Sequence, residues 1–191
     1  DMHALYAYFM KGVAPVKHAN KPVDIPWPMS MRWPLAMWRW TFAPAVHDFT
    51  PVAGQDPVLS RGAYLVEGLG HCGACHTPRA LTMQEKALSA TDGSTFLSGS
   101  APLEGGIATC LRGGHTAGLG SWDETQLVQF LKTGRSDRSA VFGGMSDVIV
   151  HSMQYMSDAD LTAIARYLKS LPAVDSTDKP HQYDPAVADA A

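Results

Sequence analysis

Apolar residues recur at helical spacing in three segments of the chain, each bounded by polar residues or glycine. The first covers residues 61–70. The second opens at Ser121 with a capping-box pattern that ends in Glu124, and it closes near Gly134. The third opens at Ser157, with an acidic residue three positions later. The apolar faces comprise Tyr64, Leu65 and Leu69; Leu127, Phe130 and Leu131; and Leu161, Ile164, Ala165 and Leu168. This pattern predicts an all-α domain.

The start of the chain repeats the pattern of the last predicted helix. Asp, Ala and Tyr occupy the same offsets in residues 1–9 and 160–168, and both segments then run into a proline, at Pro15 and Pro172. We therefore expect residues 1–14 to be the last helix of a preceding, similar module. The alternative is that amphipathic helices resemble one another by composition alone.

A Pro/Trp-rich extension, residues 15–57, separates this helix from the rest of the chain. Its eight prolines favour extended backbone over helix. It also holds four of the five tryptophans, all between Trp27 and Trp40. Side chains of this size need a surface to cover, which is either the protein's own domains or a partner subunit. A membrane-interface belt is a third option.

Composition excludes several classes of protein. The 191 residues are 46% apolar and 17% charged, which is typical of a globular chain. Fifteen Lys and Arg against 18 Asp and Glu give a formal charge of −3, so nucleic acid is not expected as a partner. Three cysteines do not make a disulfide framework. No apolar run approaches the roughly 20 residues that a membrane-spanning helix needs.

The chemistry of the chain is concentrated in the pentad Cys72-Gly-Ala-Cys75-His76. This is CxxCH, the attachment motif of c-type haem. Two thiols at this spacing can each add to one vinyl group of haem. The histidine that follows then supplies the proximal imidazole to the iron. The motif predicts one covalently bound haem c.

Two other interpretations of the cysteines stay open. A structural zinc site would need Cys110 and either His71 or His115 to complete the four ligands. A thioredoxin-like redox pair would need a βαβ context, which the hydrophobic pattern does not provide.

The second axial position of the iron decides between electron transfer and the binding of small molecules. Met145 follows two glycines and lies 69 residues after His76, in a segment expected to be a loop before the last helix. We predict that Met145 is the second ligand. The alternative function is a haem-based ligand-binding or sensor domain with an open sixth position. The other candidate ligands are Met153, Met156, His115 and His151.

Several motifs together resemble the cytochrome c subunit of membrane-bound bacterial dehydrogenases, both quinoprotein alcohol dehydrogenases and flavoprotein gluconate or sorbitol dehydrogenases. The similar segments are residues 25–28, 61–68, 71–79, 120–122, 130–135, 144–147, 151–152 and 158–172. From the first to the last of these segments, the resemblance extends over nearly the whole chain. The resemblance implies a class I cytochrome c-like haem domain over residues 58–173, with residues 174–191 leading toward a following module.

The same resemblance implies the function. It indicates an electron-transfer subunit rather than an enzyme, on the periplasmic side of the cytoplasmic membrane and held there through partners. Single electrons would pass from a dehydrogenase catalytic subunit, through adjacent haem modules, to ubiquinone or another membrane acceptor. Cys72 and Cys75 would hold the haem, His76 and Met145 would be the axial ligands, and Arg79 is placed among the cofactor-binding residues.

Three positions depart from the family pattern. Gly106 stands where the family usually has Trp, and Thr109 stands where it usually has Pro. That proline commonly helps to hold the backbone carbonyl that accepts a hydrogen bond from the proximal histidine. Cys110 replaces a small polar residue. We expect these changes to alter the packing and the potential of the haem pocket, and a free thiol beside a haem invites oxidation.

Overall fold

A computed structural model describes residues 1–100 and 107–174. The expectations for Gly106 and for residues 175–191 therefore lie outside the described residues. The chain divides into two units, which we call the N-terminal unit (Asp1–Ala45) and the C-terminal unit (Val46–Ala191). Within the described ranges both units are built from helices and contain no β-strand, which confirms the all-α prediction. No helix in this part of the chain is long and apolar enough to cross a membrane.

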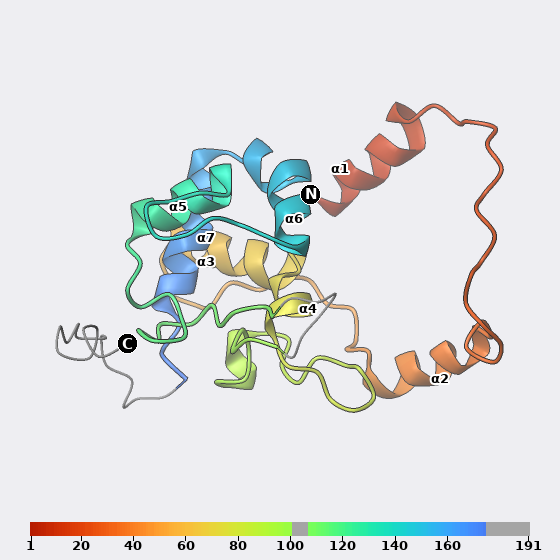
Figure 1. Cartoon of the computed structure of the whole chain (residues 1–191), viewed down its shortest axis with the longest axis horizontal. Coiled ribbons are helices and arrows are strands. Elements are labelled where there is room, and N and C mark those ends of the chain that lie inside the picture. Colours follow the sequence, from red (N-terminus) through yellow and green to blue (C-terminus); the bar gives the residue numbers. More distant parts are fainter. Residues whose placement is uncertain (101–106, 175–191) are drawn as a thin grey trace, which may run out of the picture. The chain divides into compact units, whose positions relative to one another are not determined.

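The C-terminal unit carries the CxxCH motif on one of its shorter helices (Figure 1). Its elements are α3 (Pro57–Ala63) with its π-helical continuation η2 (Tyr64–Leu69), α4 (Cys72–His76), η3 (Ala90–Asp92), α5 (Glu124–Thr133), α6 (Gly144–His151), η4 (Met153–Tyr155) and α7 (Asp158–Ser170). Fully buried side chains from three parts of the unit meet in its core: Val66, Phe96, Leu97 and Leu161. The predicted apolar stripe of the last helix is buried as expected.

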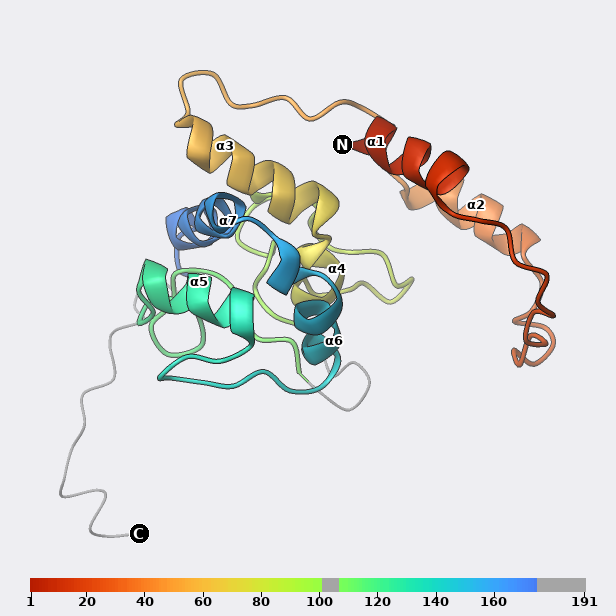
Figure 2. The same ribbon diagram turned by 90° about the horizontal axis from the view of Figure 1, so that it is seen from above.

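Helices α3 and α7 cross at very short range, side by side in both views (Figure 2). Gly62 makes this approach possible, because a Cβ atom there would lie 2.1 Å from the carbonyl oxygen of Ala163 and 2.6 Å from Cβ of Tyr167. The Tyr167 hydroxyl donates a hydrogen bond to Glu67 on η2. Burial, followed by this contact with Glu67, raises the pKa of Tyr167, so the phenol stays protonated.

A bidentate ion pair also links the two helices. Arg61 donates from Nε to Asp160 Oδ1 at 2.8 Å and from Nη2 to Oδ2 at 3.1 Å. The hydrogen bonds from Arg61 hold the pKa of Asp160 below its ordinary value. The pair is partly exposed, with 41% of the Arg61 side chain and 27% of the Asp160 side chain accessible, so solvent screens it.

Replacing Asp160 by Asn is expected to lower the free energy of unfolding by about 0.5–1 kcal/mol near neutral pH. The carboxylate has a lowered pKa in the folded chain. Its stabilisation is therefore complete above the unfolded value of about 3.9 and is lost as pH falls through the folded value. Denaturant unfolding of both chains between pH 7 and pH 3 should show the difference closing on acidification. Asp158→Asn is the matched control, because its ion-pair oxygen lies 3.3 Å from Lys132 on a side chain that is 85% exposed. If the difference in the free energy of unfolding between Asp160→Asn and the parent chain stays constant down to pH 3, the Asp160 carboxylate is not the source of that difference.

Local signals set the ends of the helices, and two predictions of a helix start were wrong. Helix α3 begins at Pro57, after its N-cap Asp56, rather than at Arg61. Helix α5 begins two residues later than Ser121 suggested. Its N-cap is Asp123, which forms a reciprocal capping box with Gln126. Gly134 ends the helix in the left-handed conformation, as the pattern predicted. Ser157 caps α7 through the backbone N–H of Asp160, also as predicted.

The N-terminal unit contains two helical stretches. The first is α1 (Met2–Ala7), continued by η1 (Tyr8–Gly12), in the predicted position. The second, α2 (Trp33–Phe42), lies inside the Pro-rich segment, where the prolines led us to expect extended backbone. The expectation failed because Pro34 lies in the first turn of α2, where proline costs no helical hydrogen bond. No residue of the unit is buried.

Candidate haem site

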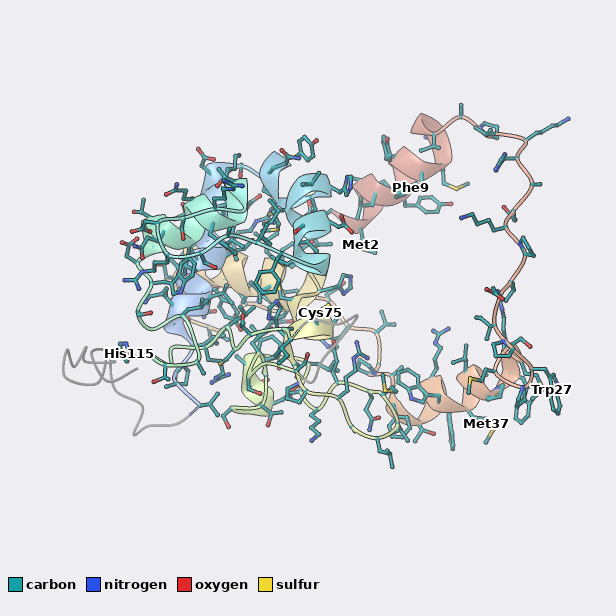
Figure 3. The ribbon with its side chains drawn as sticks, in the orientation of Figure 1. Met2, Phe9, Trp27, Met37, Cys75 and His115 are labelled. Carbon is teal, nitrogen blue, oxygen red and sulfur yellow. The ribbon has the colours of Figure 1, made fainter. Side chains whose placement is uncertain are left out.

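Helix α4 presents both cysteines and the histidine of the motif within little more than one turn. It begins after His71, which adopts a left-handed conformation with φ of 50°. Cys72 is half-buried and Cys75 is exposed, and both are free thiols (Figure 3). Burial raises the pKa of the Cys72 thiol to about 11, so it is protonated at neutral pH.

The imidazole of His76 is fixed in one tautomer. Its Nδ1 lies 2.8 Å from the carbonyl oxygen of Thr109. A carbonyl can only accept, so Nδ1 carries the proton and Nε2 keeps its lone pair. Burial lowers the pKa of His76, and the smaller effect of the Thr109 carbonyl acts in the opposite direction. The ring is therefore held neutral, which is the form that binds a metal.

A short antiparallel pairing holds the Thr109 carbonyl in place. Ser100 N donates to Ala108 O at 3.0 Å, and Leu111 N donates to Leu97 O at 2.9 Å. Gly99, with φ of 93°, donates from its backbone N to His76 O at 2.8 Å and so ties this pairing back to α4. The backbone supplies the acceptor for His76 although residue 109 is not proline.

Thr77 supports the same pairing, although the sequence did not identify it as a residue of the site. Its side chain is fully buried, and its hydroxyl accepts a hydrogen bond from Leu97 N at 3.0 Å. Gly73 packs beside it, since a Cβ atom there would lie 3.4 Å from Thr77 Oγ1 and 3.3 Å from Phe96 Cε2. Its place directly after the CxxCH motif could have indicated this role, because a histidine that binds a metal is held in orientation by neighbouring polar groups.

Replacing Thr77 by Val keeps the shape but removes the acceptor from the buried Leu97 N–H. The expected loss is about 1–3 kcal/mol in the free energy of unfolding. Thr125→Val, on an exposed position of α5, makes the same chemical change and should stay within about 0.5 kcal/mol of the parent. Denaturant unfolding followed by far-UV circular dichroism measures both. Equal effects of the two variants would remove Thr77 from this role.

Arg79 links α4 to the loop that follows it. Its Nη2 donates to Ala74 O at 2.7 Å, and its Nη1 donates to Met83 O at 2.6 Å. An isolated bridge between Arg79 and Glu85 closes the loop. Arg79 thus positions backbone next to the motif, and its assignment as a cofactor-binding residue stays a prediction.

Met145 lies in the first turn of α6, not in the loop expected from its glycines. Gly143, with φ of 62°, is the N-cap that turns the chain into this helix. The side chain is half-buried and packs on the core, but so do Met153 and Met156. Helices α4 and α6 lie on the same side of the C-terminal unit in both views (Figures 1 and 2). Packing alone does not distinguish Met145 from the other two methionines.

In the described part of the chain, the cysteines and histidines proposed as zinc ligands do not form a metal-binding cluster. His115 and Cys75 lie at opposite ends of the C-terminal unit (Figure 3). Among residues 1–100 and 107–174, no group of three or more His, Cys, Asp or Glu side chains is placed to hold a metal ion. Cys110 is half-buried and accepts a hydrogen bond from Arg112 N at 3.5 Å, next to the Thr109 carbonyl.

The residues of α4 fit a covalently attached haem. The two thiols are unpaired with each other and lie on one short helix. The imidazole at its end has a single tautomer with a free Nε2, oriented by a backbone carbonyl from a distant segment. This arrangement can bind iron on one side and leaves the identity of the second ligand to other elements.

Comparison with known proteins finds cytochrome subunits that are similar to the chain, although no protein-family model matches it. It is 63% identical over 191 residues to the gluconate 2-dehydrogenase cytochrome c subunit of Pantoea cypripedii, covering all of this chain and 43% of that protein. It is 57% identical over 188 residues to the cytochrome c subunit of alcohol dehydrogenase (quinone) from Gluconacetobacter polyoxogenes, covering 98% of this chain and 40% of that protein.

A more distant relative has a similar name. The fructose dehydrogenase cytochrome subunit of Gluconobacter japonicus is 38% identical over 177 residues, which cover 91% of this chain and 34% of that protein. The chain thus spans less than half the length of the relatives that it matches. All three are cytochrome subunits of dehydrogenases rather than catalytic subunits. Over the residues that match, the chain is similar to the cytochrome c subunits of bacterial dehydrogenases.

Proposed function

We propose that the C-terminal unit is a class I cytochrome c domain that carries one haem c and transfers single electrons. Cys72 and Cys75 would hold the haem by thioether bonds, and His76 Nε2 and the Met145 sulfur would bind its iron. The haem iron supplies the chemistry when bound, by cycling between its ferric and ferrous states. The observation that carries the proposal is the hydrogen bond from His76 Nδ1 to the Thr109 carbonyl. It leaves the lone pair of Nε2 available to bind iron.

The chain's own residues orient the proposed ligands. The carbonyl of Thr109 fixes the plane and tautomer of His76. Arg79 ties the following loop to α4, next to the attachment site. Met145 is supported by the packing of its side chain on the core. A ligand set that does not rearrange between the two iron states is what rapid electron transfer needs.

The proposed route follows from what the relatives are called. Electrons would enter from a dehydrogenase catalytic subunit and leave toward ubiquinone or another membrane acceptor, on the periplasmic side. The names of the relatives, cytochrome subunits of gluconate, alcohol and fructose dehydrogenases, support this role. Adjacent haem modules would share the route, since the relatives are more than twice as long as this chain.

The N-terminal helix supports a modular arrangement. In α7, Asp160 pairs with Arg61, the backbone of Ala163 meets Gly62, and Tyr167 packs on the same glycine. The equivalent residues of the N-terminal segment are Asp1, Ala4 and Tyr8, at the same spacing. We therefore infer that residues 1–14 belong to a preceding cytochrome module and dock there as α7 docks on α3. Residues 15–57 would then link it to the domain 58–173, and residues 174–191 would lead to the next module.

Counting the covalent haem tests the proposal. The chain is produced in cells that attach haem c and examined by a pyridine haemochrome spectrum beside the intact mass. We expect one haem per chain, low-spin when reduced, and none in the double variant Cys72→Ser, Cys75→Ser. The single variant Cys110→Ser is the matched control and should keep its haem. A chain that holds zinc and no haem would contradict the proposal. Loss of haem in the single variant Cys110→Ser would also contradict it.

A further inference from the structure

Arg112 is the one buried charged side chain among residues 1–100 and 107–174. It is 3% exposed, whereas the other buried polar residues, Ser60 and Thr77, are uncharged. The guanidinium group of arginine keeps its proton at every pH at which proteins are folded. A permanent charge in the interior is costly unless hydrogen bonds replace its water. The haem site described above does not account for this charge.

Backbone carbonyls replace the water around the Arg112 guanidinium. Its Nε donates to Pro172 O at 2.9 Å, and its Nη1 donates to Phe96 O at 2.9 Å. The same Nη1 also lies 3.5 Å from Gly93 O. Within the described ranges no carboxylate accepts a hydrogen bond from Arg112, so peptide dipoles solvate the charge and no direct ion pair neutralises it.

The charge of Arg112 acts on a neighbouring buried group. Burial and the contact with Glu67 raise the pKa of Tyr167, and the charge of Arg112 acts on this pKa in the opposite direction. The other charged groups nearby are engaged elsewhere. The Glu67 carboxylate accepts from the Tyr167 hydroxyl and from a backbone N–H, Asp92 is exposed, and Lys169 donates to backbone carbonyls of another loop.

Arg112 lies next to the backbone pairing that orients His76. It follows Thr109, whose carbonyl accepts from His76 Nδ1, by three residues, and three residues span at most about 10 Å. Its contact with Phe96 leads to the CxxCH motif, because a Cβ atom at Gly73 would lie 3.3 Å from Cε2 of that ring. Arg112 is thus tied, through two different segments, to groups that contact helix α4.

A buried positive charge favours the reduction of a nearby iron. Reduction adds one electron, so a cation stabilises the ferrous state relative to the ferric state. Salt and water screen a buried charge much less than an exposed one. At an effective dielectric constant of about 20, a unit charge about 12 Å away changes the equilibrium for one electron about tenfold.

We propose that Arg112 is a positioning residue for the proposed electron transfer, and that its buried charge raises the reduction potential of the haem. The inference rests on the proposed function, since it needs a haem on α4. The carbonyl contacts keep the charge in one place, and arginine does not release its proton in the interior, whereas lysine does so readily. The charge is therefore the same in both oxidation states.

Redox titration of haem-loaded variants tests the proposal. Arg112→Gln removes the charge and keeps an N–H donor, whereas Arg112→Lys keeps the charge on a side chain of similar length. Arg112→Gln should shift the equilibrium toward the ferric state about tenfold, which is about 59 mV for a one-electron couple. Arg112→Lys should stay within about twofold of the parent at pH 6, where the carbonyl acceptors keep its ammonium group charged.

The pH profile of the potential separates the charge from the hydrogen bonds. Burial lowers the pKa of a lysine, so the side chain of Arg112→Lys should lose its proton as pH rises from 6 toward about 10. Its potential should then fall to that of Arg112→Gln. The difference between the parent and Arg112→Gln should stay constant over the same range, because arginine remains charged and the Tyr167 phenol remains protonated.

Two further variants serve as controls. Arg138→Met removes an exposed arginine of the same unit, and solvent screening should keep its potential within about twofold of the parent. Arg112→Met is a second neutral variant and should match Arg112→Gln. If neither neutral variant folds, the pH profile of Arg112→Lys against the parent still tests the charge.

Three results would overturn the proposal. The first is a potential in Arg112→Gln equal to that of the parent. The second is an equal fall in Arg112→Lys and Arg112→Gln at pH 6, because lost hydrogen bonds would then explain it. The third is a potential in Arg112→Lys that changes with pH only as the parent does. Haem content is measured beside each titration, so the absence of haem from the parent, which contradicts the proposed function, is distinguished from these results.

Discussion

Replacing Gly62 by Ala is expected to destabilise the C-terminal unit by about 3 kcal/mol or more. The added Cβ would lie 2.1 Å from a backbone oxygen of α7, and a backbone atom does not move aside as the end of a flexible side chain can. The helices must therefore separate. Their separation weakens the ion pair between Arg61 and Asp160 and the hydrogen bond between Tyr167 and Glu67. Thermal and denaturant unfolding of the haem-loaded chain, followed by far-UV circular dichroism, would measure the loss.

Gly68 provides the matched control in the same continuous helix. A Cβ atom there meets nothing within 4 Å, and the residue is exposed. Gly68→Ala should therefore be neutral or stabilise the chain by about 0.5 kcal/mol, because alanine has the higher helix propensity. If both variants have the same stability, the short approach of α3 and α7 is not what holds the domain together. Soret absorbance of Gly62→Ala should also broaden, since α3 leads directly into α4.

Sequence reasoning succeeded where the signal was local. The apolar stripe of α7, its Ser157 cap and the Gly134 stop of α5 all depend on residues within one or two turns. The start of α5 was misplaced because two overlapping capping patterns exist, and Asp123 with Gln126 wins over Ser121 with Glu124. Helix α2 was missed because the number of prolines in a segment does not decide whether it is helical. Proline is tolerated in the first turn of a helix, where Pro34 lies.

The parts of the site that escaped prediction depend on contacts between distant segments. CxxCH is contiguous, so its residues could be singled out from the chain alone. The acceptor for His76 lies 33 positions away and is a backbone carbonyl, which no side-chain pattern reveals. The Thr77 hydroxyl accepts from Leu97 N, and Gly99 N donates to His76 O, so both act on the same tertiary pairing. Such groups can be found only once the fold brings the segments together.

The absence of proline at position 109 illustrates the same point. The family resemblance ties the carbonyl that accepts the hydrogen bond from His76 to a proline, and the absence of this proline led us to expect altered packing of the haem pocket. In the structure the pairing between residues 97–100 and 108–111 presents the Thr109 carbonyl at 2.8 Å from His76 Nδ1. A rigid ring and a short hydrogen-bonded ladder are alternative ways to immobilise one carbonyl. The proline is therefore not required for the geometry.

Replacing Met145 by Ala is expected to open the iron to external ligands. If the thioether is the sixth ligand, the reduced variant should bind one carbon monoxide per haem, while the parent chain binds almost none. The reduction potential should also fall, because a methionine ligand raises it. Absorbance titration with carbon monoxide and a redox titration measure these effects. The second variant, Met145→His, supplies another strong ligand from the same position and should again exclude carbon monoxide.

Met153→Ala is the control that separates ligation from packing. Met145 and Met153 are both half-buried on the same core, so each truncation should cost roughly 2 kcal/mol of stability. Only the loss of Met145 should change the coordination of the iron. If Met153→Ala admits carbon monoxide and Met145→Ala does not, the ligand has been assigned to the wrong element. If the parent chain itself binds carbon monoxide readily, the sixth position is open, and the domain is a ligand-binding haem protein rather than an electron carrier.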